Sequence, residues 1–127
     1  MIIAICLQES RLQHRKQING PARGFAQFER GGGVKGVMHH RATASFAAEV
    51  CKALSYEPTS NAVYDALSDN DVLAAVFARL LLYTLPRPLP GPADEGWEQY
   101  LSAWRPGKPH PETWEAFYHE AWGAVDG

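Results

Sequence analysis

One apolar segment constrains the fold of this chain more than any other part of the sequence. It begins with Asp-Asn-Asp at residues 69 to 71 and continues as VLAAVFARLLLY with a single charge, Arg79. Aspartate and asparagine favour the first turn of a helix, where their side chains accept hydrogen bonds from free backbone N–H groups. We therefore predict a core helix over residues 69 to 84 and a mainly α-helical fold around it.

Apolar periodicity predicts two longer helices before this segment. Residues 2 to 13 are apolar at nearly every early position, which indicates a helix buried on most sides. In residues 41 to 54, the side chains Phe46, Val50 and Leu54 recur at every fourth position, beside Ala47 and Cys51. That spacing predicts that all three lie on the inward face of an amphipathic helix.

Glycine and proline mark the segments that we expect to be non-helical. Residues 18 to 36 contain Gly20-Pro21, Gly24 and a triple glycine, which together predict a loop or a small β-hairpin region. Four alternate prolines between residues 86 and 92 predict an extended connector inside one domain.

Three shorter or aromatic helices complete the predicted fold. Residues 60 to 67 form a short helix with Ser60 as its cap and with Val63 and Leu67 inward. Two aromatic helices follow the prolines, the second with Pro111 in its first turn. Their faces carry Trp97, Tyr100, Leu101 and Trp104, and then Trp114, Phe117, Tyr118, Ala121 and Trp122.

Length and cysteine content bound the class of protein. A chain of 127 residues fits one domain with a single core, residues 1–127. Cys6 and Cys51 lack metal-ligand spacing, so we interpret them as small buried hydrophobic residues, with a bridge between them as the alternative. The start MIIAICL is too short for a secretory signal, and no segment has transmembrane length.

Charge is unevenly distributed although the net charge is only −2. Residues 1 to 52 contain eight Lys/Arg and three Asp/Glu, whereas residues 53 to 127 contain four and eleven. A basic front half can attract an anionic polymer such as cell wall or nucleic acid. Ordinary surface charge shared unequally between two faces explains the same pattern.

Glu9 interrupts the apolar pattern of the first predicted helix. Positions 2, 5, 9 and 12 form one stripe, so Ile2, Ile5 and Leu12 bracket this carboxyl group on a face suited to burial. Burial raises the pKa of a carboxyl group, which lets a general acid hold its proton near neutral pH. The alternative is that Glu9 marks the exposed polar end of the helix.

The residues around Glu9 resemble a known superfamily. Glu9-Ser10 is followed downstream by Gly24-Phe25-Ala26-Gln27, and this pattern is similar to that of lytic transglycosylases and goose-type lysozymes. The resemblance implies a lysozyme-like helical domain in which a buried helix carries the catalytic acid. It implies that Glu9 is that acid, Ser10 its polar neighbour and Gln27 an amide that lines the glycan cleft.

The resemblance also implies an activity, namely cleavage of peptidoglycan between N-acetylmuramic acid and N-acetylglucosamine. In the transglycosylases, a Tyr-Asn-Ala-Gly segment near the end of the domain supplies a tyrosine close to the acid. Its nearest counterpart here, residues 100 to 107, reads YLSAWRPG and lacks that pattern. The choice between hydrolysis and a 1,6-anhydro product therefore stays open.

Glycosidic cleavage needs a proton for the leaving oxygen and a group that stabilises an oxocarbenium-like centre. Glu9 would supply the proton, and Glu29 is the best candidate for a second catalytic carboxylate. The alternative is that Glu29 pairs with Arg30 or Arg23 in solvent, in which case Glu9 would act twice, first as acid and then as base.

Further side chains are candidates for substrate binding. Ser10 and Gln27 can hydrogen-bond to sugar hydroxyl or N-acetyl groups. Phe25, Phe28, Tyr100 and Trp104 are the aromatic residues that we would place near a cleft, although for Trp104 a core anchor for the last two helices is the favoured interpretation. We expect no cofactor and no metal, because the adjacent His39 and His40 point apart in any regular structure.

Two other readings remain open. One is a catalytically inactive member of the same fold that binds glycan or serves in virion assembly, and the other is a small nucleic-acid-binding module that uses the basic front half. Without a signal peptide, we expect a bacteriophage or prophage product that stays in the cytoplasm until it is released to the cell wall or carried in a virion. Its partner would be peptidoglycan, without nucleic acid and without membrane insertion.

Overall fold

The computed structural model describes residues 1–126, and over this range the chain is mainly α-helical with no β-sheet. A five-residue π-helix, Arg30–Val34, runs directly into α2. The seven α-helices of the described chain are α1 (Ile2–Ser10), α2 (Lys35–His39), α3 (Ala44–Ala53), α4 (Ser60–Ala66), α5 (Asp71–Tyr83), α6 (Ala93–Trp104) and α7 (Pro111–Asp126).

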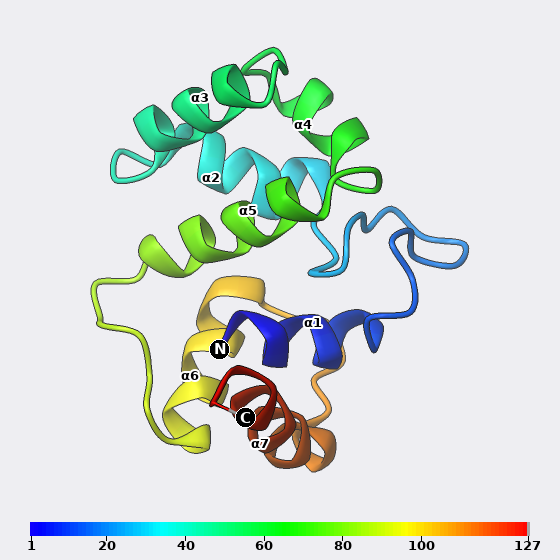
Figure 1. Ribbon diagram of the computed structural model, residues 1–127, viewed down its shortest axis with the longest axis vertical. Helices are drawn as coiled ribbons and strands as arrows, with labels where there is room; N and C mark the ends of the chain where they lie inside the picture. The colour runs from blue at the N-terminus through cyan, green and yellow to red at the C-terminus, as the bar shows by residue number, and fades with distance from the viewer. Residues whose placement is uncertain (127) are drawn as a thin grey trace.

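The helix α5 lies between two groups of helices (Figure 1). On one side α2, α3 and α4 enclose an apolar cluster that includes Leu73, Phe77 and Leu81 of α5. On the other side α1, α6 and α7 form a second cluster, to which α5 contributes Leu82. The prediction of a central helix in a mainly α-helical fold is therefore confirmed.

The N-terminus of α5 is capped as its sequence predicts. The side chain of Asn70 accepts a hydrogen bond of 3.0 Å from the backbone N–H of Leu73, which satisfies a donor that the helix itself leaves free. In α4 the cap is Thr59, which accepts from Ala62, and not Ser60 as predicted. Pro111 begins α7, as expected for a residue without a backbone N–H.

The helix α1 is shorter than predicted. It ends at Ser10 because Arg11 and Leu12 adopt left-handed backbone angles, with φ of 58° and 56°. Ile5 is fully buried, but Leu12 lies beyond the helix and is 41% exposed. The predicted stripe is therefore wrong at Leu12, and the apolar surroundings of Glu9 come from elsewhere in the fold.

The glycine-rich segment is only partly a loop. Two isolated antiparallel bridges, Lys16 to Arg23 and Arg23 to Phe28, give the hairpin-like region that the sequence predicts. The triple glycine is helical instead, and Gly33 lets the ring of Phe28 lie against the backbone of this helix. A Cβ atom at position 33 would come within 2.6 Å of Cδ1 of Phe28.

The prediction that Phe46 of α3 faces the core is wrong. Phe46 is 48% exposed and packs edge-on against Tyr83 of α5. The two smaller residues predicted beside this stripe, Ala47 and Cys51, are fully buried, so the prediction is confirmed there. Cys51 and Cys6 are both buried free thiols, which confirms their interpretation as small core residues.

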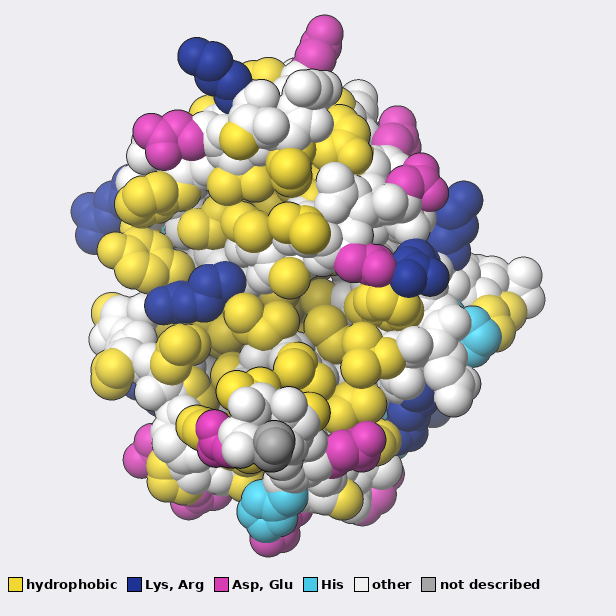
Figure 2. Space-filling model, in the orientation of Figure 1, with side chains coloured by type: hydrophobic (Ala, Val, Ile, Leu, Met, Phe, Trp, Pro, Cys, Tyr) yellow, Lys and Arg dark blue, Asp and Glu magenta, His cyan; other side chains and the backbone are white. Residues whose placement is uncertain are grey.

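Apolar side chains gather across the middle of the face shown in Figure 2. Part of this surface lies where the two ends of the described chain meet. Leu89, Trp122 and Val125 are each exposed by 41% or more there, beside residues of the first turn of α1. Among residues 1–126, no helix is long and apolar enough to span a membrane.

Candidate active site

Glu9 lies in the last turn of α1, half-buried between the buried residues Leu7 and Ser10. Its Oε2 atom accepts a hydrogen bond of 3.0 Å from the hydroxyl group of Tyr100 in α6. Burial raises the pKa of Glu9 to about 7, while the Tyr100 hydrogen bond opposes the shift and the charge of Glu29 adds to it. This carboxyl group therefore exchanges its proton near neutral pH.

Glu9 opens into a polar cavity of about 270 Å³. Two segments far apart in the sequence face each other across it: the hairpin-like region after α1 and the loop after α6. This volume is near the lower end of the range of about 300–1,000 Å³ common for ligand pockets. The cavity is lined by Glu9, Gln17, Ala22, Gln27, Glu29, Trp104, Arg105, Pro106, Gly107 and Lys108.

A smaller hollow of about 70 Å³ adjoins this cavity. The two share Gln27, Glu29 and Trp104 as lining residues, and the hollow continues over Phe28 to Leu81. The Glu9 cavity is therefore one part of a longer depression, as an extended ligand would require. We call the two together the Glu9 cleft.

The segment that carries Gln27 is held in place by backbone contacts. Gly24 has a φ of +75°, and its carbonyl oxygen accepts a hydrogen bond of 2.9 Å from Nε2 of Gln27. Gln27 itself has a φ of 56°. Trp104 fixes the same segment from α6, because its Nε1 atom donates to the carbonyl oxygen of Ala26 at 2.9 Å.

Glu29 is exposed and lines the cleft. Among residues 1–126, it forms no ion pair with Arg23 or Arg30. Arg23 donates instead to the carbonyl oxygens of Gly20 and Ala22, and Arg30 donates to Asn61. The structure therefore favours the placement of Glu29 beside Glu9 over the alternative of a solvent ion pair.

Ser10 is placed differently from the sequence prediction. Its buried hydroxyl group lies 2.7 Å from the carbonyl oxygen of Phe25 and 3.0 Å from that of Cys6. It therefore ties α1 to the Gln27 segment and does not line the cleft. The prediction that Ser10 contacts substrate is therefore not supported: its hydroxyl group instead positions the segment that carries Phe25 and Gln27.

The predicted aromatic residues occupy three different settings. Trp104 lines the cleft and packs edge-on against Phe28, which is buried but reaches the smaller hollow. Tyr100 is buried and meets the cleft through its contact with Glu9. Phe25 lies under the guanidinium group of Arg15, 4.4 Å from the ring centre, and outside the residues that line the cleft.

The loop at residues 105–108 is the part of the site that sequence reasoning missed. The sequence RPGKP indicates a turn, but no local signal places that turn opposite Glu9. Comparisons with protein-family models, curated proteins and solved structures found no match. The candidate site therefore stands on its own geometry.

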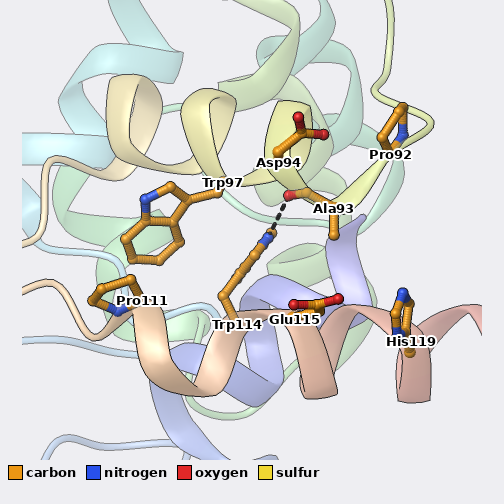
Figure 3. Close-up of a pocket in the computed structure, with 8 residues that line it drawn as sticks. All are labelled: Pro92, Ala93, Asp94, Trp97, Pro111, Trp114, Glu115 and His119. Carbon is orange, nitrogen blue, oxygen red and sulfur yellow. Dashed lines mark hydrogen bonds between the residues drawn. The ribbon is translucent and has the colours of Figure 1, made fainter.

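A second and larger cavity, of about 520 Å³, lies between the start of α6 and α7 (Figure 3). Trp97 and Trp114 form its apolar wall, and Nε1 of Trp114 donates to the carbonyl oxygen of Ala93 at 2.8 Å. Its acids, Asp94 and Glu115, are both exposed. It therefore lacks a desolvated carboxyl group, whereas the Glu9 cleft combines one with polar walls. Residues 1–126 contain no cluster of three metal-ligating side chains.

Proposed function

We propose that this protein cleaves the glycan strands of peptidoglycan as a lysozyme-like enzyme, with Glu9 as its general acid and base. The observation that carries the proposal is the desolvated Glu9 carboxyl group, with a pKa of about 7, at the wall of a polar cleft. Two features of the sequence add support: the Glu9-Ser10 pair and the downstream Gly24 to Gln27 pattern.

The geometry suggests how Glu9 would hold its proton. Tyr100 donates to Oε2, so the proton of the neutral acid belongs on Oε1. Near pH 7 a group with a pKa of about 7 is close to half protonated. Glu9 would deliver this proton to the glycosidic oxygen as the C1–O bond breaks, leaving an oxocarbenium-like centre on the other sugar.

Two routes complete the reaction in this proposal. Glu29, which lines the same cleft, can stabilise the positive centre or activate a water molecule. Alternatively Glu9, now a carboxylate, takes a proton from water or from the C6 hydroxyl group of the sugar. Water gives a reducing end whether Glu29 or Glu9 activates it, and the C6 hydroxyl gives a 1,6-anhydro end, so mass spectrometry of the products separates hydrolysis from the 1,6-anhydro reaction.

Clearing of purified cell walls tests the proposal. Wild type should reduce turbidity, and Glu9→Gln should reduce the rate at least about 100-fold, the scale of a lost general acid. Glu115→Gln is the matched control, because it makes the same change at an exposed acid of α7 and should leave the rate unchanged.

Equal clearing by wild type and Glu9→Gln would remove Glu9 from the reaction. Binding of both proteins to walls without any clearing by wild type would instead favour an inactive glycan-binding or virion protein. Retention on DNA that falls steeply with salt, without activity on walls, would favour a nucleic-acid module.

A further inference from the structure

Two cationic side chains line the Glu9 cleft. Arg105 and Lys108 belong to the loop after α6, and both are exposed. Among residues 1–126, neither forms an ion pair with an aspartate or glutamate. Arg105 donates one long hydrogen bond of 3.4 Å from Nε to the carbonyl oxygen of Ser102, whereas Arg15 pairs with Asp71 at 2.8 Å. The loop therefore presents two positive charges to whatever enters the cleft.

The loop is anchored at both ends. At its start, Arg105 adopts a left-handed conformation with a φ of 48°, and its backbone N–H donates to the carbonyl oxygen of Leu101 at 3.1 Å. At its end, the carbonyl oxygen of His110 accepts from Nε2 of Gln8 at 2.9 Å, and Thr113 donates to Oε1 of Gln8 at 2.9 Å. Gln8 is the residue before Glu9, so these contacts hold the end of the loop against the helix that carries the acid.

Two prolines restrict the backbone between these anchors. Pro106 and Pro109 fix φ on either side of the Gly107-Lys108 pair. A short loop that is pinned at both ends loses little conformational freedom when a ligand binds, so its charges are partly preorganised. Anchoring of the loop, and the lack of an ion pair to either cation within residues 1–126, together suit a role in recognition.

We propose that Arg105 and Lys108 bind carboxylate groups of the substrate, and so make the cleft selective for an acidic glycan over a neutral one. This inference rests on the proposed function and deepens it. Peptidoglycan carries carboxylates on its muramic acid residues or on the peptides attached to them, whereas a neutral β-linked N-acetylglucosamine polymer has none. A guanidinium group binds carboxylate through paired N–H donors, and the lysine adds a second positive charge.

Exposure limits the strength of these contacts and makes them sensitive to salt. Ion pairs at an exposed rim are screened over about 8–10 Å at physiological ionic strength. We therefore expect a preference of about tenfold for the acidic substrate at low salt, falling toward unity at high salt.

Matched substrates isolate the carboxylates. Purified peptidoglycan is compared with the same material after its carboxyl groups have been converted to amides, which leaves the glycan intact. Wild type should cleave the native form about tenfold faster at low salt. Arg105→Gln combined with Lys108→Gln should bring this preference close to unity, because the rate falls more on the native form than on the amidated form.

The control variant combines Arg41→Gln with Lys52→Gln. It makes the same change in net charge at exposed positions around α3, so it should keep the wild-type preference. Equal losses by the Arg105/Lys108 variant on both substrates, or an unchanged preference, would overturn the inference. Circular dichroism of each variant shows whether the fold is retained.

Binding separates this inference from the proposed function. Calorimetric titration of Glu9→Gln with soluble muropeptides, native and amidated, measures recognition without catalysis. Tighter binding of the native form that depends on Arg105 and Lys108 supports the inference even if wild type cleaves neither substrate, a result that would refute the proposed activity. Equal affinity for the two forms would overturn the inference while leaving the activity intact.

Discussion

Tyr100 donates a 3.0 Å hydrogen bond to Glu9 across a separation of 91 residues in the sequence. The same phenol ring stacks on Trp114 with a 13° angle between the ring planes, so α7 helps to hold it in place. Burial and the nearby Glu9 raise the pKa of the Tyr100 hydroxyl far above its ordinary value. Tyr100 therefore remains a neutral donor throughout the pH range in which Glu9 titrates.

Removal of this donor should change the pH dependence of activity. The hydrogen bond lowers the pKa of Glu9 and so opposes the effect of burial. In Tyr100→Phe the pKa of Glu9 should rise further, and the alkaline limb of the pH–rate profile for wall clearing should move to higher pH. Tyr56→Phe, which removes a hydroxyl group that contacts Asn70, should leave the limb in place. A shift to lower pH in Tyr100→Phe would contradict this account.

Glu9 should also make the stability of the fold depend on pH. Its pKa is about 7 in the folded protein and near 4.5 when exposed. Because the pKa is raised in the folded protein, the stability of the fold is highest, as far as Glu9 is concerned, below pH 4.5. This contribution to stability is lost as pH rises through about 7. At pH 8, Glu9→Gln should therefore unfold at a higher temperature than wild type. Its free energy of unfolding should be greater by about 1–2 kcal/mol, once partial exposure of the group is taken into account.

The same comparison at pH 4 should show little difference between wild type and Glu9→Gln. At that pH the carboxyl group of wild type is mostly neutral in the folded and in the unfolded protein. Thermal unfolding followed by circular dichroism at pH 4, 6 and 8 measures the trend. Glu115→Gln is the control, because it makes the same change at an exposed acid of α7. A Glu9→Gln variant that is less stable than wild type at pH 8 would show that the charged form is favoured in the folded protein.

The π-helix Arg30–Val34 should tolerate an added methyl group at one glycine and not at another. A Cβ atom at position 33 would meet the ring of Phe28, whereas one at position 31 would have no atom within 4 Å. Gly33→Ala should cost about 1–3 kcal/mol through overpacking. Gly31→Ala should be neutral or stabilising by about 0.5 kcal/mol, since it restricts the unfolded chain. Urea unfolding of the two variants distinguishes these outcomes, and equal stabilities would contradict the packing described for Phe28.

Gln8 should matter for substrate affinity through the loop that it anchors. Gln8→Ala removes its hydrogen bonds to His110 and Thr113 and should cost about 1 kcal/mol in stability. A looser loop should raise KM for soluble glycan strands while leaving kcat nearly unchanged, because Glu9 keeps its contact with Tyr100. Gln13→Ala, at an exposed position just after α1, is the control. A fall in kcat at constant KM would argue against this role for the loop.

Local sequence patterns were sufficient for much of the fold and for one half of the site. The core helix α5 with its Asn70 cap and the start of α7 at Pro111 follow from residue types and spacing within one segment, whereas for Glu9 the segment gives only its place at the end of an apolar helix. Predictions failed where neighbouring elements decide the outcome. Phe46 has the spacing of a core residue but lies at the edge of α3, where Tyr83 covers it only in part.

The sequence alone determined most of the helical segments, though not the one at the triple glycine, and singled out Glu9 as a carboxyl group at the end of an apolar helix, because backbone preference and amphipathic spacing act over a few residues. Only the tertiary structure decided that Tyr100 reaches Glu9, that Glu29 lines the same cleft and that Arg105 and Lys108 face it. These relationships depend on how α1, α6 and α7 pack. The local sequence around each residue does not indicate which distant residue it will contact. Packing between faces is a property of the whole chain, which is why the acid was visible from the sequence and its cleft was not.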